Sequence, residues 1–289
     1  MANISKRLST NVEGDFFVDS TCIDCDTCRQ LAPATFMEES DYSVVFNQPE
    51  SAQEEFAAYQ ALIACPVGSI GTVKKNSQVF AEAQASFPLH LEDNVYYVGF
   101  NSEKSFGAHS YFIQHPEGNW LVDSPRYLKH LIQAFEKKGG IRYIFLSHED
   151  DVADAGRYAK TFGATRIIHQ ADAVAIPDAE WIVGGEEAIH PEPKFTLIPV
   201  PGHTAGSMAL LYNHCFLFSG DHLWWDRDLE RLETPHMLVW DDTHLKQSIT
   251  KLLDHSFEWV LPGHGERIHI HRHHMKKAIE ELAQRRWGS

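Results

Sequence analysis

Three cysteines within seven residues, Cys22, Cys25 and Cys28, place the strongest constraint on how the first part of this chain can fold. A fourth cysteine, Cys65, is followed directly by Pro66. Disulfide frameworks are typical of small secreted proteins, whereas clustered thiols in a chain of 289 residues indicate metal ligands. The sequence therefore predicts that these four thiolates hold a metal centre.

An iron–sulfur cube needs four thiolates; a CxxCxxC loop supplies three, and a cysteine followed by proline supplies the fourth. Ala32 stands where a two-cluster ferredoxin would carry another cysteine, so the ligands suffice for one cluster. Zinc is an alternative, but three cysteines this close together would crowd a tetrahedral site. A [3Fe–4S] cluster is a further alternative. Residues 18–72 resemble single-cluster bacterial ferredoxins, which implies an α+β ferredoxin-like domain with a [4Fe–4S] cluster on Cys22, Cys25, Cys28 and Cys65.

The hydrophobic pattern predicts two domains, 1–85 and 86–289. In the first, apolar residues at helical spacing predict a helix that ends at Cys65, because proline cannot continue it. Residues 81–88 have the composition of a linker. Beyond them, apolar strand-like runs alternate with helical segments, which predicts a layered α/β domain. We expect strands at 94–100, 110–114, 119–124, 141–147, 166–169, 195–200, 208–213, 214–220 and 259–262, and helices at 125–139, 152–163, 243–256 and 273–287.

Four polar motifs in the second domain each follow an apolar run directly. They carry, in chain order, His148 with Asp150, Asp151 and Asp154, then His203, Asp221 and His264. Side chains just past the ends of neighbouring strands can converge on one point of a rigid scaffold. Imidazole and carboxylate groups are suitable ligands for zinc or iron. The motifs therefore predict a metal site.

The segments PGHTAGS, FSGD and PGHG, in this order, resemble the metallo-β-lactamase superfamily over roughly residues 90–270. The resemblance implies an αββα sandwich with metal at one edge of its two sheets. The superfamily contains hydrolases such as glyoxalase II and oxidoreductases such as flavodiiron proteins and persulfide dioxygenases.

One motif departs from the family pattern. The pattern HxHxDH falls on residues 148–153, where Asp150 replaces the second histidine, and Val152 and Ala153 replace the pair that serves a second metal. The resemblance therefore implies one Fe or Zn ion, on His148, Asp150, His203 and Asp221, with His264 left at the other position. A degenerate site and a dinuclear site are the alternatives. Asp151 and Asp154 either ligate through a shifted backbone or form a solvated, N-capping acidic turn, which we favour for Asp154.

Three functions compete. The first is a redox enzyme, because His148, His203 and Asp221 make the 2-His-1-carboxylate set of non-haem iron, and a fused ferredoxin can supply single electrons. The second is a zinc-dependent hydrolase of a thioester or ester, with Asp150 or Asp221 as catalytic base and a structural or sensing cluster. The third is a non-catalytic electron-transfer or sensor protein. We predict the first, with a small-molecule substrate and a possible redox protein partner.

Charge and hydropathy limit the other partners. The formal net charge of −15 disfavours nucleic acid, whose binding rests on cationic contacts. No apolar run reaches the ~18 residues that a membrane helix needs. The N-terminus lacks the apolar core of a secretory signal, so we expect a cytoplasmic protein that binds neither nucleic acid nor membrane. Trp224, Trp225 and Trp240 either wall a substrate pocket or belong to the core.

Overall fold

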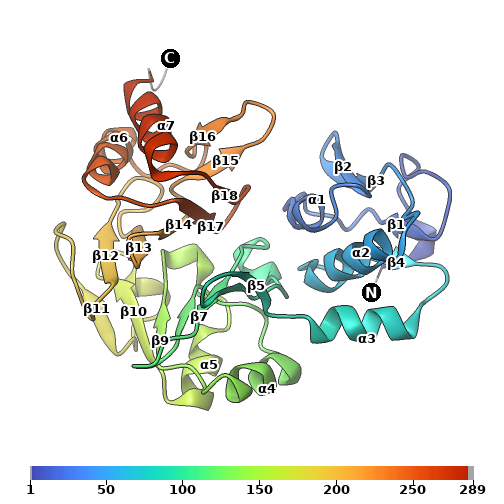
Figure 1. Ribbon diagram of the computed structural model, residues 1–289, viewed down its shortest axis with the longest axis horizontal. Coiled ribbons are helices and arrows are strands. Elements are labelled where there is room, and N and C mark those ends of the chain that lie inside the picture. The colour runs from blue at the N-terminus through green and yellow to red at the C-terminus, as the bar shows by residue number, and fades with distance from the viewer. Residues whose placement is uncertain (1, 286–289) are drawn as a thin grey trace. The chain divides into compact units, whose positions relative to one another are not determined.

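The computed structural model describes residues 2–285 (Figure 1). The chain folds into two compact units, described separately below. Unit 1 comprises residues 1–112 and 125–138, and unit 2 comprises residues 113–124 and 139–289. The domain boundary predicted between residues 85 and 86 stays a prediction. Within residues 2–285, none of the helices has the length and apolar composition needed to cross a lipid bilayer.

Unit 1 is built from short strands and helices. Its elements are η1 (Ile4–Lys6), β1 (Phe16–Val18), α1 (Thr27–Leu31), β2 (Phe36–Glu39), β3 (Tyr42–Val45), α2 (Ala52–Ala64), β4 (Ile70–Thr72), α3 (Ser77–Ala85), β5 (Leu89–Glu92), β6 (Val95–Tyr97), η2 (Glu103–Ser105) and α4 (Lys129–Lys137). Strand β1 pairs antiparallel with β4, and β2 pairs antiparallel with β3. Strand β7 (Tyr111–Ile113) carries the chain from unit 1 into unit 2.

The predicted helix before Cys65 is confirmed as α2. A capping box begins it, because the Ser51 side chain accepts from the Glu54 N–H and the Glu54 side chain bonds back to the backbone of Ser51. Cys65 is the C-cap, and its N–H donates to the Ala61 carbonyl. Pro66 prevents a further turn. The end of α2 thus places the fourth cysteine.

The linker predicted at residues 81–88 is wrong over most of its length, because α3 extends to Ala85. Asn76 caps this helix, and its N–H donates to the Tyr59 hydroxyl of α2 at 2.7 Å. Ala83 is fully buried, and α3 packs against α2. A segment rich in alanine resembles a linker in composition. Alanine nevertheless favours a helix, and its small side chain lets α3 approach α2 closely.

Unit 2 contains every strand and helix predicted within it, each with somewhat different ends. Its elements are β8 (Trp120–Val122), β9 (Tyr143–Phe145), η3 (Glu149–Asp151), α5 (Ala155–Phe162), β10 (Thr165–His169), η4 (Ala173–Ala175), β11 (Trp181–Val183), β12 (Phe195–Pro199), β13 (Met208–Tyr212), β14 (Phe216–Gly220), β15 (Trp224–Asp226), β16 (Arg231–Glu233), α6 (Asp242–Lys251), η5 (Leu252–Asp254), β17 (Trp259–Pro262), β18 (Ile268–His269) and α7 (Arg272–Gln284). The helix predicted to reach residue 287 ends earlier, and residues 286 and 287 lie outside the described residues.

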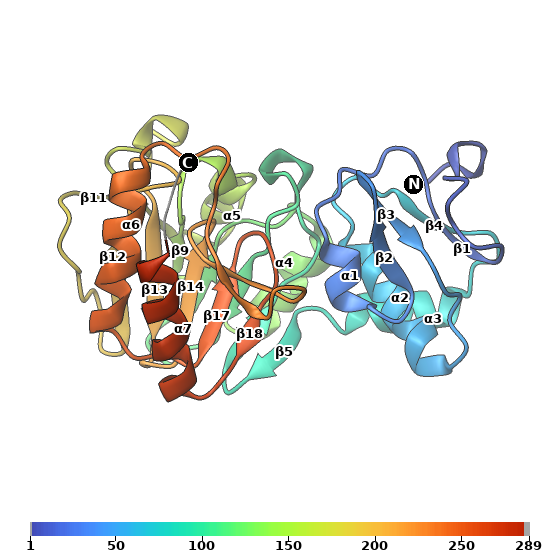
Figure 2. The ribbon, with the colours of Figure 1, turned by 90° about the horizontal axis from the view of Figure 1, so that it is seen from above.

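Two sheets form the core of unit 2. Strands β8 to β11 are parallel in the order β11-β10-β9-β8, and the second sheet has the order β12-β13-β14-β17-β18. Between the sheets, Trp120 stacks on Phe195 with ring centroids 4.4 Å apart. Helices α6 and α7 cover the outer face of the second sheet through an apolar cluster that includes Ile198, Ile249 and Ile279 (Figure 2), while α5 packs on β10. This helix–sheet–sheet–helix order is the layered sandwich that the sequence predicts.

An ion pair links β10 to Glu180, the residue just before β11. Arg166 is almost fully buried, and its guanidinium donates to the two carboxylate oxygens of Glu180 at 2.6 and 2.9 Å. This pairing lowers the pKa of Glu180 to about 2. Because the pKa falls on folding, the resulting stability is present above pH 4.5 and is lost as the pH falls through about 2.

We expect Glu180→Gln to lower the free energy of unfolding by about 1 kcal/mol at neutral pH, because water screens a partly exposed pair. Glu180 is 44% exposed. Urea denaturation at several pH values measures the effect, which should shrink toward low pH. Glu187→Gln, at an exposed position, is the control. A constant difference from wild type down to acidic pH would contradict the ion-pair explanation.

Candidate metal centres

The four cysteines predicted to bind a cluster surround one cavity in unit 1. Cys22, Cys25 and Cys28 come from the loop before α1 and from its first turn, and Cys65 comes from the end of α2. The rest of the lining is apolar or small, and consists of Val18, Ile23, Thr27, Ser43, Val67, Ser69 and Ile70. Folding therefore brings together the four sulfurs that the sequence motif separates.

Two left-handed residues shape the cysteine loop. Asp24 and Asp26 have φ angles of 54° and 57°, a conformation that aspartate adopts more readily than most residues. The bend directs the Asp24 N–H to Cys22 Sγ at 3.5 Å. Near the fourth ligand, the Ser69 N–H points to Cys65 Sγ at 3.3 Å. Hydrogen bonds to cysteine sulfur stabilise cluster ligands.

Burial makes three of the thiols in this cavity harder to ionise. Burial raises the pKa of Cys25 to about 12, and burial also raises the pKa values of Cys22 and Cys28. A nearby cation favours the thiolate forms of these three groups. The iron of a [4Fe–4S] cluster supplies that charge, so the donor set fits this group.

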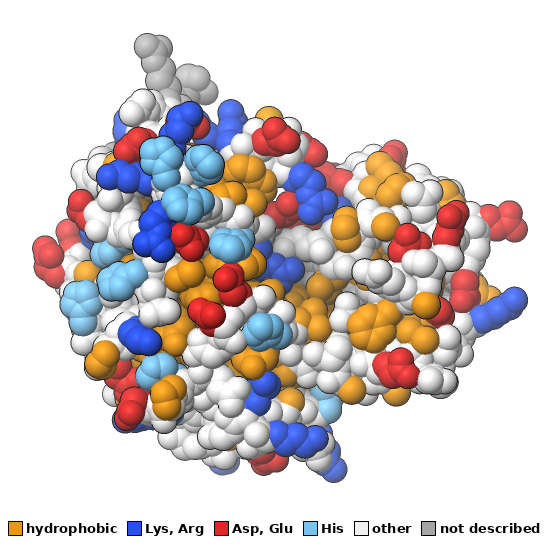
Figure 3. Space-filling view, in the orientation of Figure 1, with side chains coloured by type: hydrophobic (Ala, Val, Ile, Leu, Met, Phe, Trp, Pro, Cys, Tyr) orange, Lys and Arg blue, Asp and Glu red, His pale blue; other side chains and the backbone are white. Residues whose placement is uncertain are grey.

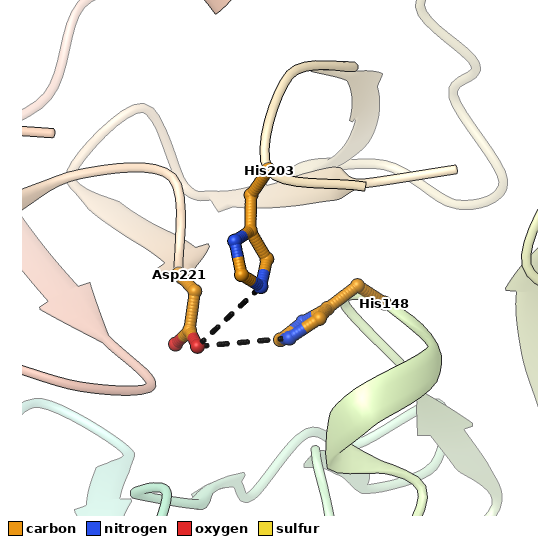
Figure 4. Close-up of side chains that lie close together, drawn as sticks. All are labelled: His148, His203 and Asp221. Carbon is orange, nitrogen blue, oxygen red and sulfur yellow. Dashed lines mark ion pairs between the residues drawn. The ribbon is translucent and has the colours of Figure 1, made fainter. Parts of the chain in front are cut away.

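In unit 2, three side chains from three loops point toward one another (Figure 4). His148 follows β9, His203 lies between β12 and β13, and Asp221 follows β14. Asp221 Oδ2 lies 3.6 Å from His148 Nε2 and 3.9 Å from His203 Nε2. The structure thus brings together the 2-His-1-carboxylate set predicted from the sequence.

Buried polar atoms without hydrogen-bond partners mark the same point. Within residues 2–285, Nε2 of His148 and both ring nitrogens of His203 have no hydrogen-bond partner, and the two Nε2 atoms are the ones that lie near Asp221. An unpaired buried polar atom costs about 1–3 kcal/mol, so such atoms are expected where a metal completes the site. Burial also lowers the pKa of His148, which favours the neutral imidazole that coordinates metals. The donors fit zinc or iron.

Asp150 reaches the same point from the solvent side. Its Oδ2 lies 3.4 Å from His203 Nε2 and 3.7 Å from His148 Nε2, and its side chain is 63% exposed. The carboxylate therefore stands where it can bind a metal or exchange a proton with a substrate.

A second group of ligand atoms forms from Asp151, Asp221 and His264, all within 4.8 Å of one another. His264 Nδ1 lies 2.8 Å from Asp221 Oδ2. Asp151 is fully buried, and neither of its carboxylate oxygens has a hydrogen-bond partner among the described residues. Burial, with the nearby charge of Asp221, raises the pKa of Asp151 well above its ordinary value. Of the two alternatives for Asp151, the ligating one fits this geometry, and Asp221 is shared by both groups.

The solvated capping role favoured for Asp154 is wrong. Asp154 is the N-cap residue of α5, but its side chain makes no capping hydrogen bond and is buried. Its carboxylate lies 3.8 Å from the Arg157 guanidinium. Of the residues in the short η3 turn between His148 and α5, only Asp151 is buried.

Sequence reasoning missed Asp123, which supports the His148 loop. Its carboxylate accepts from the Ser147 N–H at 2.8 Å, and burial raises its pKa to about 7. Ser147 Oγ in turn lies 2.9 Å from His148 Nδ1. The sequence did contain the signal that marks the four polar motifs, because Asp123 also follows an apolar run directly.

A group of exposed histidines lies elsewhere on unit 2. Figure 3 shows histidine side chains gathered over α7 and the adjoining β18, and the four exposed members are His269, His271, His273 and His274. Within residues 2–285, they do not bring three ligand atoms within 4.8 Å of one another. They are therefore weaker metal-site candidates than the buried groups.

We expect Gly263→Ala to weaken metal binding in unit 2 by about 10-fold or more, because displaced ligand carboxylates lose their geometry. A Cβ at this position would lie 2.6 Å from Asp221 Oδ1 and 2.9 Å from Asp151 Oδ2. Metal analysis after equilibrium dialysis measures the change.

Gly156→Ala in α5 is the matched control. A Cβ there would meet nothing closer than 3.6 Å. Alanine should stabilise the helix by about 0.5–1 kcal/mol and leave metal content unchanged. Equal metal content in the Gly263 and Gly156 variants would contradict the crowding argument.

Comparisons with known proteins bear on the cysteine-rich segment and on the fold of the remaining chain. Residues 18–72 match the family model described as the 4Fe-4S single cluster domain of Ferredoxin I. No curated protein matches the sequence. Among solved structures, the DIM-1 metallo-β-lactamase is 16% identical with a TM-score of 0.50, covering 67% of this chain and 96% of that chain.

A metallo-β-lactamase family protein from Thermus thermophilus is also 16% identical with a TM-score of 0.50, covering 67% of this chain and 79% of that chain. At this identity the likeness shows the fold alone. The chain therefore combines a 4Fe–4S single-cluster domain with a metallo-β-lactamase fold. The α+β ferredoxin-like fold of the N-terminal part stays a prediction.

Proposed function

We propose that the protein is a redox metalloenzyme in which the metal site of unit 2 acts on a small-molecule substrate and the cluster supplies single electrons. The observation that carries this proposal is the convergence of His148, His203 and Asp221 in a chain that also holds four convergent cysteines. Two histidines and one carboxylate are the usual set of non-haem iron enzymes. A hydrolase has no need for a one-electron carrier.

The residues of the site have separate roles in this proposal. A bound metal supplies Lewis acidity and, as iron, a one-electron redox change. The Ser147 hydroxyl orients the ring of His148 at Nδ1. Burial alone would raise the pKa of Asp221, but the nearby His264 imidazole holds it below its usual value, so the carboxylate stays ionised. The exposed Asp150 exchanges a proton with the substrate.

A zinc-dependent hydrolase of thioesters or esters is the second candidate. In the family pattern a second metal is held by a residue pair that Val152 and Ala153 replace in this chain. Asp151, Asp221 and His264 lie close together and offer ligands for such a second metal. This arrangement favours the hydrolase. Asp150 would then accept a proton from the attacking water. The cluster would be structural or would sense the redox state.

The proposal includes a redox protein partner for the cluster and a cytoplasmic location, where an oxygen-sensitive cluster would be protected. It includes no nucleic acid and no membrane among the partners. The acidic net charge supports the exclusion of nucleic acid.

Anaerobic purification with metal quantification and EPR tests the proposal. About five irons per chain or more, with little zinc, supports it, since four belong to the cluster. About four irons with zinc, and thioester turnover that ignores the oxidation state of the cluster, favours the hydrolase. About four irons and no metal in unit 2 would leave a non-catalytic electron-transfer or sensor protein, and would refute both enzyme proposals.

A further inference from the structure

A short loop in unit 2 is attached to two of the metal-ligand motifs. We call residues 235–240, between β16 and α6, the rim loop. Just before it, Thr234 Oγ1 donates to the carbonyl of His222, the residue after Asp221, at 2.7 Å. At its other end, the Trp240 N–H donates to the His203 carbonyl at 3.0 Å. The rim loop is thus held beside the metal ligands at both ends.

The tip of the rim loop exposes large apolar side chains. Met237, Leu238 and Trp240 are 75%, 86% and 54% exposed. Single exposed apolar residues are common, but a group of large ones within four residues of the chain is typical of a binding surface. Leu238 also has a φ of 54°, which is uncommon for a branched residue. The loop therefore holds an apolar tip in solvent at a conformational cost.

A second aromatic residue lies beside His264. A Cβ on Gly265, the residue after His264, would lie 2.4 Å from Trp224 Cγ, so the indole packs directly on this backbone. The φ of Gly265 is +83°, which also favours glycine here. Next to it, the Trp225 N–H donates to the Glu266 carbonyl at 3.0 Å. Trp224 is only partly buried.

We infer that the rim loop and Trp224 form an apolar subsite, and that the substrate carries an uncharged apolar group of about ring size next to the atom that reaches the metal. This inference rests on the metal-site function proposed above. Apolar side chains next to the His203 and His264 loops favour a group that water solvates poorly. The exposed Asp150 carboxylate disfavours an anionic group at the open side of the site.

Two metal-binding probes that differ in one group test the inference. Acetohydroxamate and benzohydroxamate offer the same two oxygens to a metal, but only the second carries a ring. We expect the anaerobically purified holoprotein to bind benzohydroxamate about 10-fold more tightly, because the ring leaves water. Isothermal titration calorimetry measures both dissociation constants.

The matched variants separate the rim loop from the metal site. The double variant Met237→Gln and Leu238→Asn keeps side-chain size, and asparagine tolerates the positive φ. We expect it to lose most of the preference for benzohydroxamate while acetohydroxamate binding stays unchanged. Ile182→Asn, at an exposed position of β11, should change neither affinity.

Three other outcomes would each overturn the inference. An unchanged preference for benzohydroxamate in the double variant would overturn the apolar subsite and leave the metal site standing. Failure of both hydroxamates to bind would overturn the proposed metal function, and the subsite with it. If the double variant instead loses self-association in sedimentation, with unchanged probe preference, the loop contacts a second copy of the chain and the inference fails.

Discussion

Cys65→Ser is expected to yield a protein that has lost nearly all of its cluster iron. Serine offers a hydroxyl that does not ionise at neutral pH, whereas an iron–sulfur cluster is held by thiolates. Cys65 is 8% exposed at the end of α2, so no solvent ligand has easy access to replace it. Because metal binding contributes directly to folding in small domains, we also expect the free energy of unfolding to fall by several kcal/mol.

Iron content and visible absorption after anaerobic purification measure the loss of the cluster. Cys215→Ser is the matched control, since Cys215 lies in unit 2 and its Sγ is 4.0 Å from Glu258 Oε2. That variant should keep wild-type iron. A Cys65→Ser protein with a full complement of cluster iron would show that the fourth ligand is another group.

Asp221→Asn is expected to remove metal from both ligand groups of unit 2, because both groups contain this carboxylate. Loss of a ligand should weaken binding by more than about 100-fold, since changes to outer-shell partners alone cost 10–100-fold. The amide keeps the shape of the side chain but loses the negative charge that faces His148, His203 and His264. Enzymatic turnover should fall with metal occupancy.

Asp151→Asn distinguishes the two positions. It should lower metal content at one position only, because Asp151 belongs to the second group alone. Asp228→Asn, at an exposed position, should leave metal content unchanged. Retention of all the unit 2 metal by Asp221→Asn would contradict a shared carboxylate and would require a different ligand set.

Local sequence patterns predicted the elements that place the candidate metal ligands. His148, His203, Asp221 and His264 each follow a buried apolar run, and each run forms a strand: β9, β12, β14 and β17. Such runs are recognisable because an interior strand must be apolar on both faces. The motifs after them then meet at one edge of the sandwich, as the family resemblance implied.

Short or partly exposed elements escaped prediction. Strands β11, β15, β16 and β18 have two or three residues each, too few for a periodic pattern to stand out. Helix α3 was mistaken for a linker because only its packing against α2 distinguishes a small-residue helix from a flexible segment.

The sequence by itself determined which thiols, imidazoles and carboxylates are candidate metal ligands, because ligand chemistry and spacing are local properties of the chain. Only the tertiary structure decided which aspartates lie among the candidate ligands. Asp151 was one of several adjacent acidic residues, and its burial between Asp221 and His264 depends on how the η3 turn meets two other loops. Tertiary packing likewise placed Trp224 on the Gly265 backbone and the rim loop beside His203, because side-chain direction at a loop depends on neighbours distant in sequence.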